Sequence, residues 1–180
     1  MEKDKLQKYF MDVVKEFNNK HSFLNKEQNI IFTEEEKEYI KRERASFHDA
    51  LKTTLGNPED YRLHPLLADS LERLTIATGL GLLGSDLEAK GKHEEALLEY
   101  IKSILISGNE VYDNYFFMAD IFYKIGKEDK SLIFYQLYLQ EAEKHKEELK
   151  QRANQKDADI IDFISRKCGE ARQRIKELTK

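Results

Sequence analysis

The chain has 180 residues, with 30 Lys plus Arg against 34 Asp plus Glu, 36% charged residues and 40% hydrophobic residues. This length is enough for one domain with a hydrophobic core. Because charges of both signs are interleaved and the net charge is −4, a phosphate backbone or an anionic membrane is a poor partner. Apolar runs such as Leu80 to Leu83 are far shorter than the roughly 20 residues of a membrane span, and the start lacks a secretory signal. The lone Cys168 excludes an internal disulfide, and we expect a cytoplasmic protein.

The N-terminal third predicts two helices joined by a connector. An apolar stripe with helical spacing runs through residues 4–17, and the asparagine-rich connector 18–32 brings apolar side chains that we expect to pack on the body. Thr33 and Glu36 form a capping box, in which each side chain satisfies a backbone N–H of the other. This box predicts the start of a second helix, which we expect to end at Gly56 before a turn at residues 57–60.

A long helix is predicted from Pro65 to Lys90, because no polar turn cluster intervenes. Gly79, Gly81 and Gly84 lie within it and indicate the close approach of a neighbouring backbone, since glycine otherwise weakens a helix. Their spacing fits Gly-x-Gly-x-x-Gly, but no strand precedes them and no Lys-Ser/Thr follows. Helix packing is therefore favoured over phosphate binding.

An internal repeat follows, with a constant offset of 35 residues. In each copy, large, small and large residues share one helical face, a glycine turn follows, and a small residue and an aromatic lie on a second helix. A small side chain such as Gly84 or Ala119 allows two antiparallel helices to pack closely beneath a bulky partner. Leu80, Leu83, Gly84, Leu87, Gly91, Ala96, Tyr100 and Ser103 match Tyr115, Met118, Ala119, Phe122, Gly126, Ser131, Tyr135 and Tyr138.

This pattern resembles the tetratricopeptide repeat (TPR), and the stretch from Gly91 to Ala96, followed by Tyr100, is similar to the most recognisable part of that motif. The resemblance implies an all-α fold, a right-handed solenoid of TPR-like helical hairpins. Two repeats would span residues 77–145, with residues 1–76 as an N-terminal helical region packing on them.

Residues 146–180 complete the predicted architecture with an extended helix and a C-terminal capping helix. Stacked repeats need such a cap, because the last repeat exposes an apolar face. The capping helix carries an apolar stripe with alternating steps of three and four residues: Ile161, Ile164, Cys168, Ala171, Ile175 and Leu178. We expect an interruption at residues 154–157, before this last helix.

Sequence motifs give no support for an enzyme, a cofactor or a metal centre. The five histidines stand alone in sequence, no Gly-x-Ser-x-Gly surrounds a serine, and Cys168 lies on the apolar stripe. The basic residues near the C-terminus are interpreted first as a solvated helix face, and next as a surface for an acidic peptide. We therefore expect a non-enzymatic protein without a cofactor.

In the repeat family, the first helices of successive units line a concave groove, and the resemblance assigns groove positions in this chain. We expect Phe116 and Tyr123 to be the main aromatic anchors, because aromatic side chains supply much of the binding energy at interfaces. The alternative is that both pack against the capping helix. The predicted partner-binding residues are Ser85, Glu88, Asp113, Phe116, Asp120, Tyr123, Lys124 and Arg166.

The resemblance implies an adaptor or chaperone that holds a peptide or helix of another protein. The subtype that clamps the C-terminal carboxylates of heat-shock chaperones is disfavoured, because Gly81 and Ser85 replace its lysine and asparagine. The length, acidity and tandem repeats are similar to those of type III secretion class II chaperones. The alternative function is a structural subunit of a homo-oligomer or a larger assembly, and a homodimer remains open.

Overall fold

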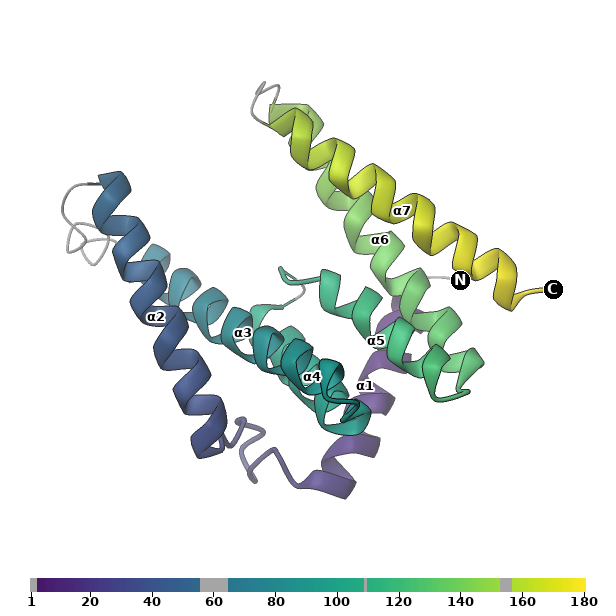
Figure 1. Cartoon of the computed structure of the whole chain (residues 1–180), viewed down its shortest axis with the longest axis horizontal. Helices are drawn as coiled ribbons and strands as arrows, with labels where there is room; N and C mark the ends of the chain where they lie inside the picture. Colours follow the sequence, from purple (N-terminus) through teal and green to yellow (C-terminus); the bar gives the residue numbers. More distant parts are fainter. Residues whose placement is uncertain (1–2, 56–64, 109, 153–156) are drawn as a thin grey trace. The chain divides into compact units, whose positions relative to one another are not determined.

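The computed structural model describes residues 3–55, 65–108, 110–152 and 157–180, and within these ranges it contains seven α-helices and no β-strand (Figure 1). The prediction of an all-α fold is therefore confirmed. An isolated bridge between Leu24 and Ile30 closes the turn in the connector. The helices are α1 (Lys3–His21), α2 (Glu34–Leu55), α3 (Pro65–Ala89), α4 (His93–Ser107), α5 (Asp113–Lys124), α6 (Glu128–Arg152) and α7 (Ala158–Leu178).

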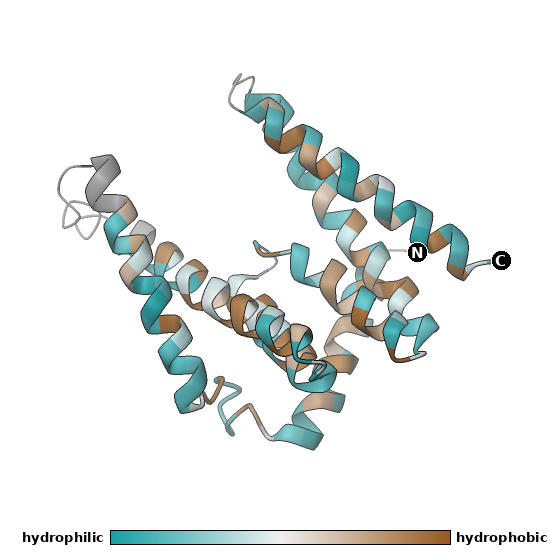
Figure 2. Cartoon of the chain, viewed as in Figure 1, coloured by the Kyte–Doolittle hydropathy of each residue, from teal (hydrophilic) through white to brown (hydrophobic). Residues whose placement is uncertain are grey.

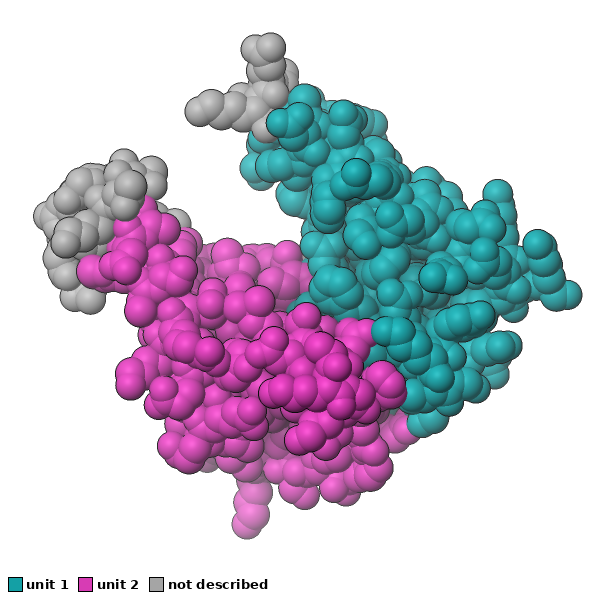
Figure 3. Space-filling view, in the orientation of Figure 1, with its two compact units in different colours: residues 1–15, 112–180 teal, residues 16–111 magenta. Residues whose placement is uncertain are grey.

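The chain divides into two compact units, coloured separately in Figure 3. The C-terminal unit comprises residues 1–15 and 112–180, and therefore contains the first part of α1 together with α5, α6 and α7. The central unit comprises residues 16–111, and contains the end of α1 together with α2, α3 and α4.

In the central unit, α2 begins at the predicted capping box. The backbone N–H of Glu36 donates to Thr33 Oγ1 at 3.3 Å, and the backbone N–H of Thr33 donates to Glu36 Oε2 at 2.7 Å. Helix α2 then packs antiparallel to α3 at Gly79, where an added Cβ would lie 3.0 Å from the Cα atom of Ile40. The predicted close approach of a backbone at this glycine is confirmed, because a side chain here would displace α2.

Helices α3 and α4 form the first antiparallel hairpin, and Gly84 lies beneath Tyr100 as its repeat position predicts. A Cβ atom at Gly84 would come within 2.8 Å of the Tyr100 ring. Farther along the hairpin, Ser103 Oγ donates a hydrogen bond of 2.6 Å to the carbonyl oxygen of Ala77. These contacts join α3 and α4 at two points along their shared face.

Helices α5 and α6 form the second hairpin, within the C-terminal unit, and an aromatic cluster fills its core. Phe10 of α1 makes edge contacts with Tyr115 and Phe134, with ring centroids 5.5 and 6.3 Å apart. Phe122 packs on Phe134 at 5.2 Å. All four rings are at most 1% exposed, so they form the centre of this unit.

The two hairpins turn in the same way, 35 residues apart. Gly91 and Gly126 have φ angles of 73° and 72°, which a glycine adopts without strain. After each glycine, a backbone N–H donates to the carbonyl oxygen five residues back, from Lys92 to Leu87 at 2.9 Å and from Lys127 to Phe122 at 2.8 Å. The sequence repeat is thus a repeat of hairpin geometry.

Helix α7 packs antiparallel on α6 through the predicted apolar stripe. Ile164, Cys168 and Ala171 are buried on this face, whereas the intervening residues are polar, a two-sided pattern that Figure 2 shows along the α7 ribbon. Arg172 forms an ion pair with Glu143 across the two helices. Helix α7 therefore packs on α6 through the apolar stripe seen in the sequence.

Two expectations need correction. The first helix continues past residue 17 to His21, because the Asn18 side chain accepts a hydrogen bond from the backbone N–H of Leu24 and so helps form its C-terminal turn. Ile31 of the connector is 52% exposed and does not pack on the body, while Phe23 does.

Four further sequence features concern helix ends and the turns between helices. Pro65 is the first residue of α3, as predicted. The predicted helix end at Gly56, the turn at residues 57–60 and the interruption at residues 154–156 lie outside the described residues. Within the described ranges, every helix is too short or too polar to cross a lipid bilayer.

Candidate protein-interaction site

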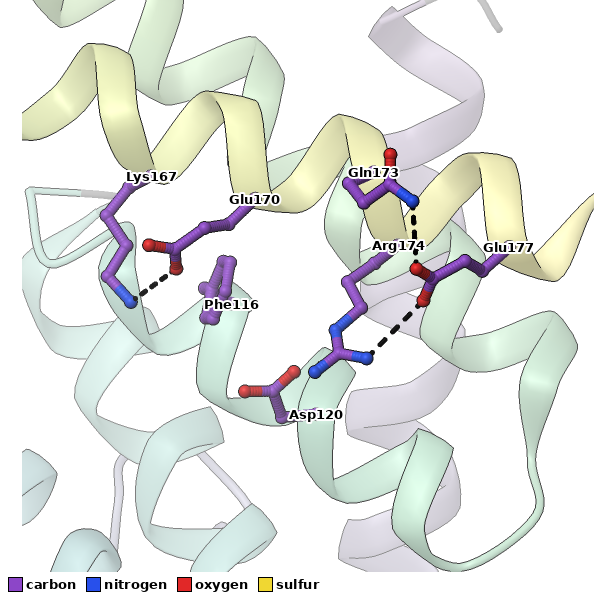
Figure 4. Close-up of a pocket in the computed structure, with 7 residues that line it drawn as sticks. All are labelled: Phe116, Asp120, Lys167, Glu170, Gln173, Arg174 and Glu177. Carbon is purple, nitrogen blue, oxygen red and sulfur yellow. Dashed lines mark hydrogen bonds and ion pairs between the residues drawn. The ribbon is translucent and has the colours of Figure 1, made fainter.

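A cavity of about 370 Å³ lies in the C-terminal unit, between α5 and α7 (Figure 4). Helix α5 supplies an aromatic ring and a carboxylate, and α7 supplies a row of charged and amide side chains. The lining residues are Phe116, Asp120, Lys167, Glu170, Gln173, Arg174 and Glu177.

Phe116 forms the apolar surface of this cavity. Its ring lies edge-on to Tyr135 and Tyr138 of α6, with centroids 5.4 and 5.3 Å apart. The Nζ atom of Lys167 lies 4.4 Å from the centre of the ring, close enough for a cation–π interaction.

Phe116 is enclosed within this unit, which is the alternative that the sequence left open for it. The side chain is only 6% exposed, because α6 and the capping helix α7 enclose it. Replacing Phe116 would reduce stability as well as change the cavity.

The walls of the cavity carry both signs of charge, and several of these groups are already paired. Lys167 Nζ donates to Glu170 Oε2 at 3.0 Å, and Arg174 Nη1 lies 3.4 Å from Glu177 Oε2. Gln173 Nε2 donates to Glu177 Oε1 at 2.9 Å. The hydrogen bond from Gln173 and the nearby guanidinium of Arg174 lower the pKa of Glu177, so this carboxylate stays ionised at neutral pH.

Asp120 holds the other wall in place from α5. It accepts a hydrogen bond from the hydroxyl of Tyr135, whose ring is buried against α5. Burial and this carboxylate both raise the pKa of Tyr135, which therefore remains a neutral donor. The hydrogen bond fixes the carboxylate of Asp120 toward the cavity, where Figure 4 shows it opposite Arg174.

Tyr123 is the exposed aromatic side chain beside this site. It is 45% exposed, and the guanidinium carbon of Arg174 lies 5.9 Å from the centre of its ring. Because Arg174 also lines the cavity, Tyr123 extends the site with an accessible apolar face. That Tyr123 is an aromatic anchor stays a prediction.

The other predicted positions lie elsewhere. Asp113, Lys124 and Arg166 are exposed on the C-terminal unit but do not line the cavity, and the guanidinium of Arg166 lies 5.5 Å from the ring centre of Phe163. Ser85 and Glu88 belong to the central unit, where the hydroxyl of Tyr100 donates to Glu88 at 3.3 Å. The structure thus brings Phe116 and Asp120 into one cavity, with Tyr123 beside it.

Sequence reasoning expected α7 to contribute Arg166 and missed the α7 residues that line the cavity. Lys167, Glu170, Arg174 and Glu177 follow one another at steps of three, four and three residues, which places them on one face of the helix. This stripe was interpreted as a solvated surface. The same spacing could have indicated a polar face turned toward a neighbouring helix.

The structure gives no support for metal or thiol chemistry in the part of the chain that it describes. It contains no group of three or more His, Cys, Asp or Glu side chains arranged to hold a metal ion there. Cys168 is fully buried, and burial raises the pKa of its thiol above the ordinary value.

No protein-family model matches the chain, and searches of curated proteins and of solved structures also found no match.

Proposed function

We propose that this chain is a non-enzymatic interaction module, an adaptor or chaperone, whose α5–α7 cavity binds a peptide or helix of another protein. The observation that carries the proposal is the cavity itself, with an aromatic ring at its base, charged walls from α7 and the exposed Tyr123 beside it. Partner segments are commonly anchored where an apolar pocket meets polar groups at its rim.

The chemistry of the cavity defines the partner segment. Three carboxylates and two cations line it, so it carries a formal excess of one negative charge. A segment that places an apolar side chain on Phe116 and Tyr123 and a lysine or arginine near Asp120 would complement both features. Extended and helical segments can each present such a pair of neighbouring side chains.

The resemblance to tetratricopeptide repeats supports the same proposal. In that family the first helix of each hairpin contributes to the groove, and here α5, the first helix of the second hairpin, supplies Phe116 and Asp120. Helix α7 would then take the place of the next first helix.

The proposal is tested by two matched carboxylate variants. Asp120→Asn removes a negative charge that lines the cavity, whereas Asp162→Asn removes one on α7 that is exposed and does not line it. A partner captured from the native cell by the wild-type chain should bind at least tenfold more weakly to Asp120→Asn and unchanged to Asp162→Asn. Equal affinity for both variants would contradict this assignment of the site.

A second candidate function, a subunit of a homo-oligomer or larger assembly, has its own observation. Ile160 and Phe163 are 46% and 43% exposed at the start of α7, one helical turn apart. If they bury against another copy, analytical ultracentrifugation of the wild-type chain should show a dimer that Phe163→Glu converts to a monomer. A wild-type chain that is monomeric at all concentrations would rule out self-association.

A further inference from the structure

Three charged side chains are buried together in the central unit, where α2 begins beside α4. Lys102 of α4 is 2% exposed, Glu36 of α2 is 1% exposed and Glu99 of α4 is 5% exposed. Lys102 Nζ donates to Glu36 Oε1, and it lies 3.4 Å from Glu99 Oε1. Phe23 of the connector, 3% exposed, lies against the same ammonium group, with 5.8 Å between Nζ and its ring centre.

If all three groups were ionised, the cluster would carry one buried negative charge without a partner. Burial of an unpaired charge is costly, and a buried carboxyl group avoids that cost by binding a proton. The location of that proton depends on which carboxyl group is better supplied with donors.

Glu36 has the donors that an ionised carboxylate needs. One of its oxygens accepts from Lys102, and the other accepts from the backbone N–H of Thr33 at 2.7 Å. It also lies in the first turn of α2, where the helix dipole favours a negative charge.

Glu99 lacks such donors. Its Oε1 atom has the long contact to Lys102, and its Oε2 atom is buried without any hydrogen-bond partner. The charged groups acting on it are Lys102 from its own helix and Glu36 from α2, and these oppose each other.

We propose that Glu99 holds a proton at neutral pH, so that Glu36, Lys102 and Glu99 form an electrically neutral cluster. This cluster joins α2 to α4, and its contribution to stability falls as the pH rises. Burial is the main cause that raises the pKa of Glu99, to about 8, with Lys102 opposing the rise and Glu36 adding to it. In the unfolded chain the same group has an ordinary pKa near 4.5.

The direction of the pH effect follows from proton linkage. Between pH 4.5 and 8 the folded chain keeps the proton on Glu99 while the unfolded chain releases it, so a rise in pH favours the unfolded state. Above pH 8 both states release the proton and the effect levels off. This single group would lower the folding equilibrium constant by up to about three thousandfold across that window.

The test compares the wild-type chain with Glu99→Gln, which keeps the shape of a protonated glutamate and cannot ionise. Urea unfolding of the intact chain should give equal stability for both near pH 4.5 and a more stable variant at pH 8 and above. Glu95→Gln changes the same charge at an exposed position on α4, and its unfolding should follow the wild-type pH profile.

A direct titration keeps the proposal testable if Glu99→Gln fails to fold. Carbon-13 NMR of the Glu99 carboxyl in the wild-type chain should show a midpoint near 8. A midpoint near the ordinary value of glutamate would overturn the proposal, and so would identical pH profiles for the wild-type chain and Glu99→Gln.

Discussion

The two hairpins have the same turns and the same helix order but bury opposite kinds of side chain. In the α3–α4 hairpin, Glu99 and Lys102 are buried beside Glu36. Thirty-five residues later, the aligned positions in the α5–α6 hairpin carry Phe134 and Leu137, both fully buried. In the first hairpin, Lys102 bonds to Glu36 in the first turn of α2. In the second hairpin, Phe134 packs against Phe10 of α1.

This difference shows that the repeat specifies the hairpin and not what covers it. The glycine turn and the small residue beneath a tyrosine set the geometry of the helix pair. The chemistry of the covering helix then decides whether a position binds a proton, packs an aromatic ring or lines a cavity.

The largest loss of stability is expected when the glutamate of the first hairpin is placed at the aligned position of the second. Phe134→Glu places a carboxyl group among the rings of Phe10, Tyr115 and Phe122. In the first hairpin Lys102 pairs with the aligned Glu99, but the residue aligned with Lys102 is Leu137, which cannot pair with a carboxylate. We expect a loss of at least about 4 kcal/mol in the free energy of unfolding, measured by urea denaturation. Phe134→Leu is the control, with an expected loss of about 1 kcal/mol. A mild effect of the glutamate would show that the aromatic core tolerates charge.

A smaller loss is expected at the tight contact of the first hairpin. Gly84→Leu forces a side chain into the ring of Tyr100 and should destabilise the chain by about 1–3 kcal/mol. Gly169→Ala is the matched control, because a Cβ atom there meets nothing within 4 Å. Its melting temperature should rise, since alanine is favoured over glycine in a helix by about 1 kcal/mol. A melting temperature of Gly84→Leu like that of the wild-type chain would contradict the packing described.

A comparison of the aligned small residues Ala96 and Ser131 predicts that Ser131→Ala makes the chain more stable. Ser131 is fully buried and its hydroxyl has no hydrogen-bond partner, whereas Ala96 holds the same position without a hydroxyl. Ser131→Ala should therefore raise the free energy of unfolding by about 1 kcal/mol. Ser103→Ala, which removes the bond to Ala77, should lower it by a similar amount. Loss of stability in Ser131→Ala would reveal a partner for that hydroxyl.

The smallest effect on stability is expected at Tyr123, an exposed aromatic residue of the second hairpin. Tyr123→Ala should change the free energy of unfolding by less than about 0.5 kcal/mol, because the side chain is 45% exposed. The same variant should weaken partner binding at least tenfold, as measured by isothermal titration calorimetry with the captured partner. A large loss of stability would instead make Tyr123 a packing residue.

The fold could be predicted further from the sequence than the site. Thr33 with Glu36, the glycines at positions 91 and 126, and Gly84 beneath Tyr100 are local or repeated signals, and each is found where it was expected. The site depends on which residues of α7 face α5, and the apolar stripe predicts only the side of α7 that packs on α6. The sequence left open whether Phe116 and Tyr123 pack against the capping helix, and the structure encloses Phe116 but leaves Tyr123 45% exposed.

The buried cluster was beyond sequence reasoning for a different cause. Glu99 and Lys102 have the spacing of an ordinary exposed pair on a helix, and only the tertiary placement of Glu36 shows that they are enclosed. Charged residues are seldom buried, so composition alone argues against such a cluster.

Site-specific photo-crosslinking tests the proposed interaction site most directly. A benzophenone side chain in place of Tyr123, beside the cavity, should form an adduct with the partner in the native cell. The same group in place of Met11, which is 39% exposed on α1, should not. Adducts from Met11 alone, or equal adducts from both positions, would contradict the assignment of the α5–α7 cavity as the binding site.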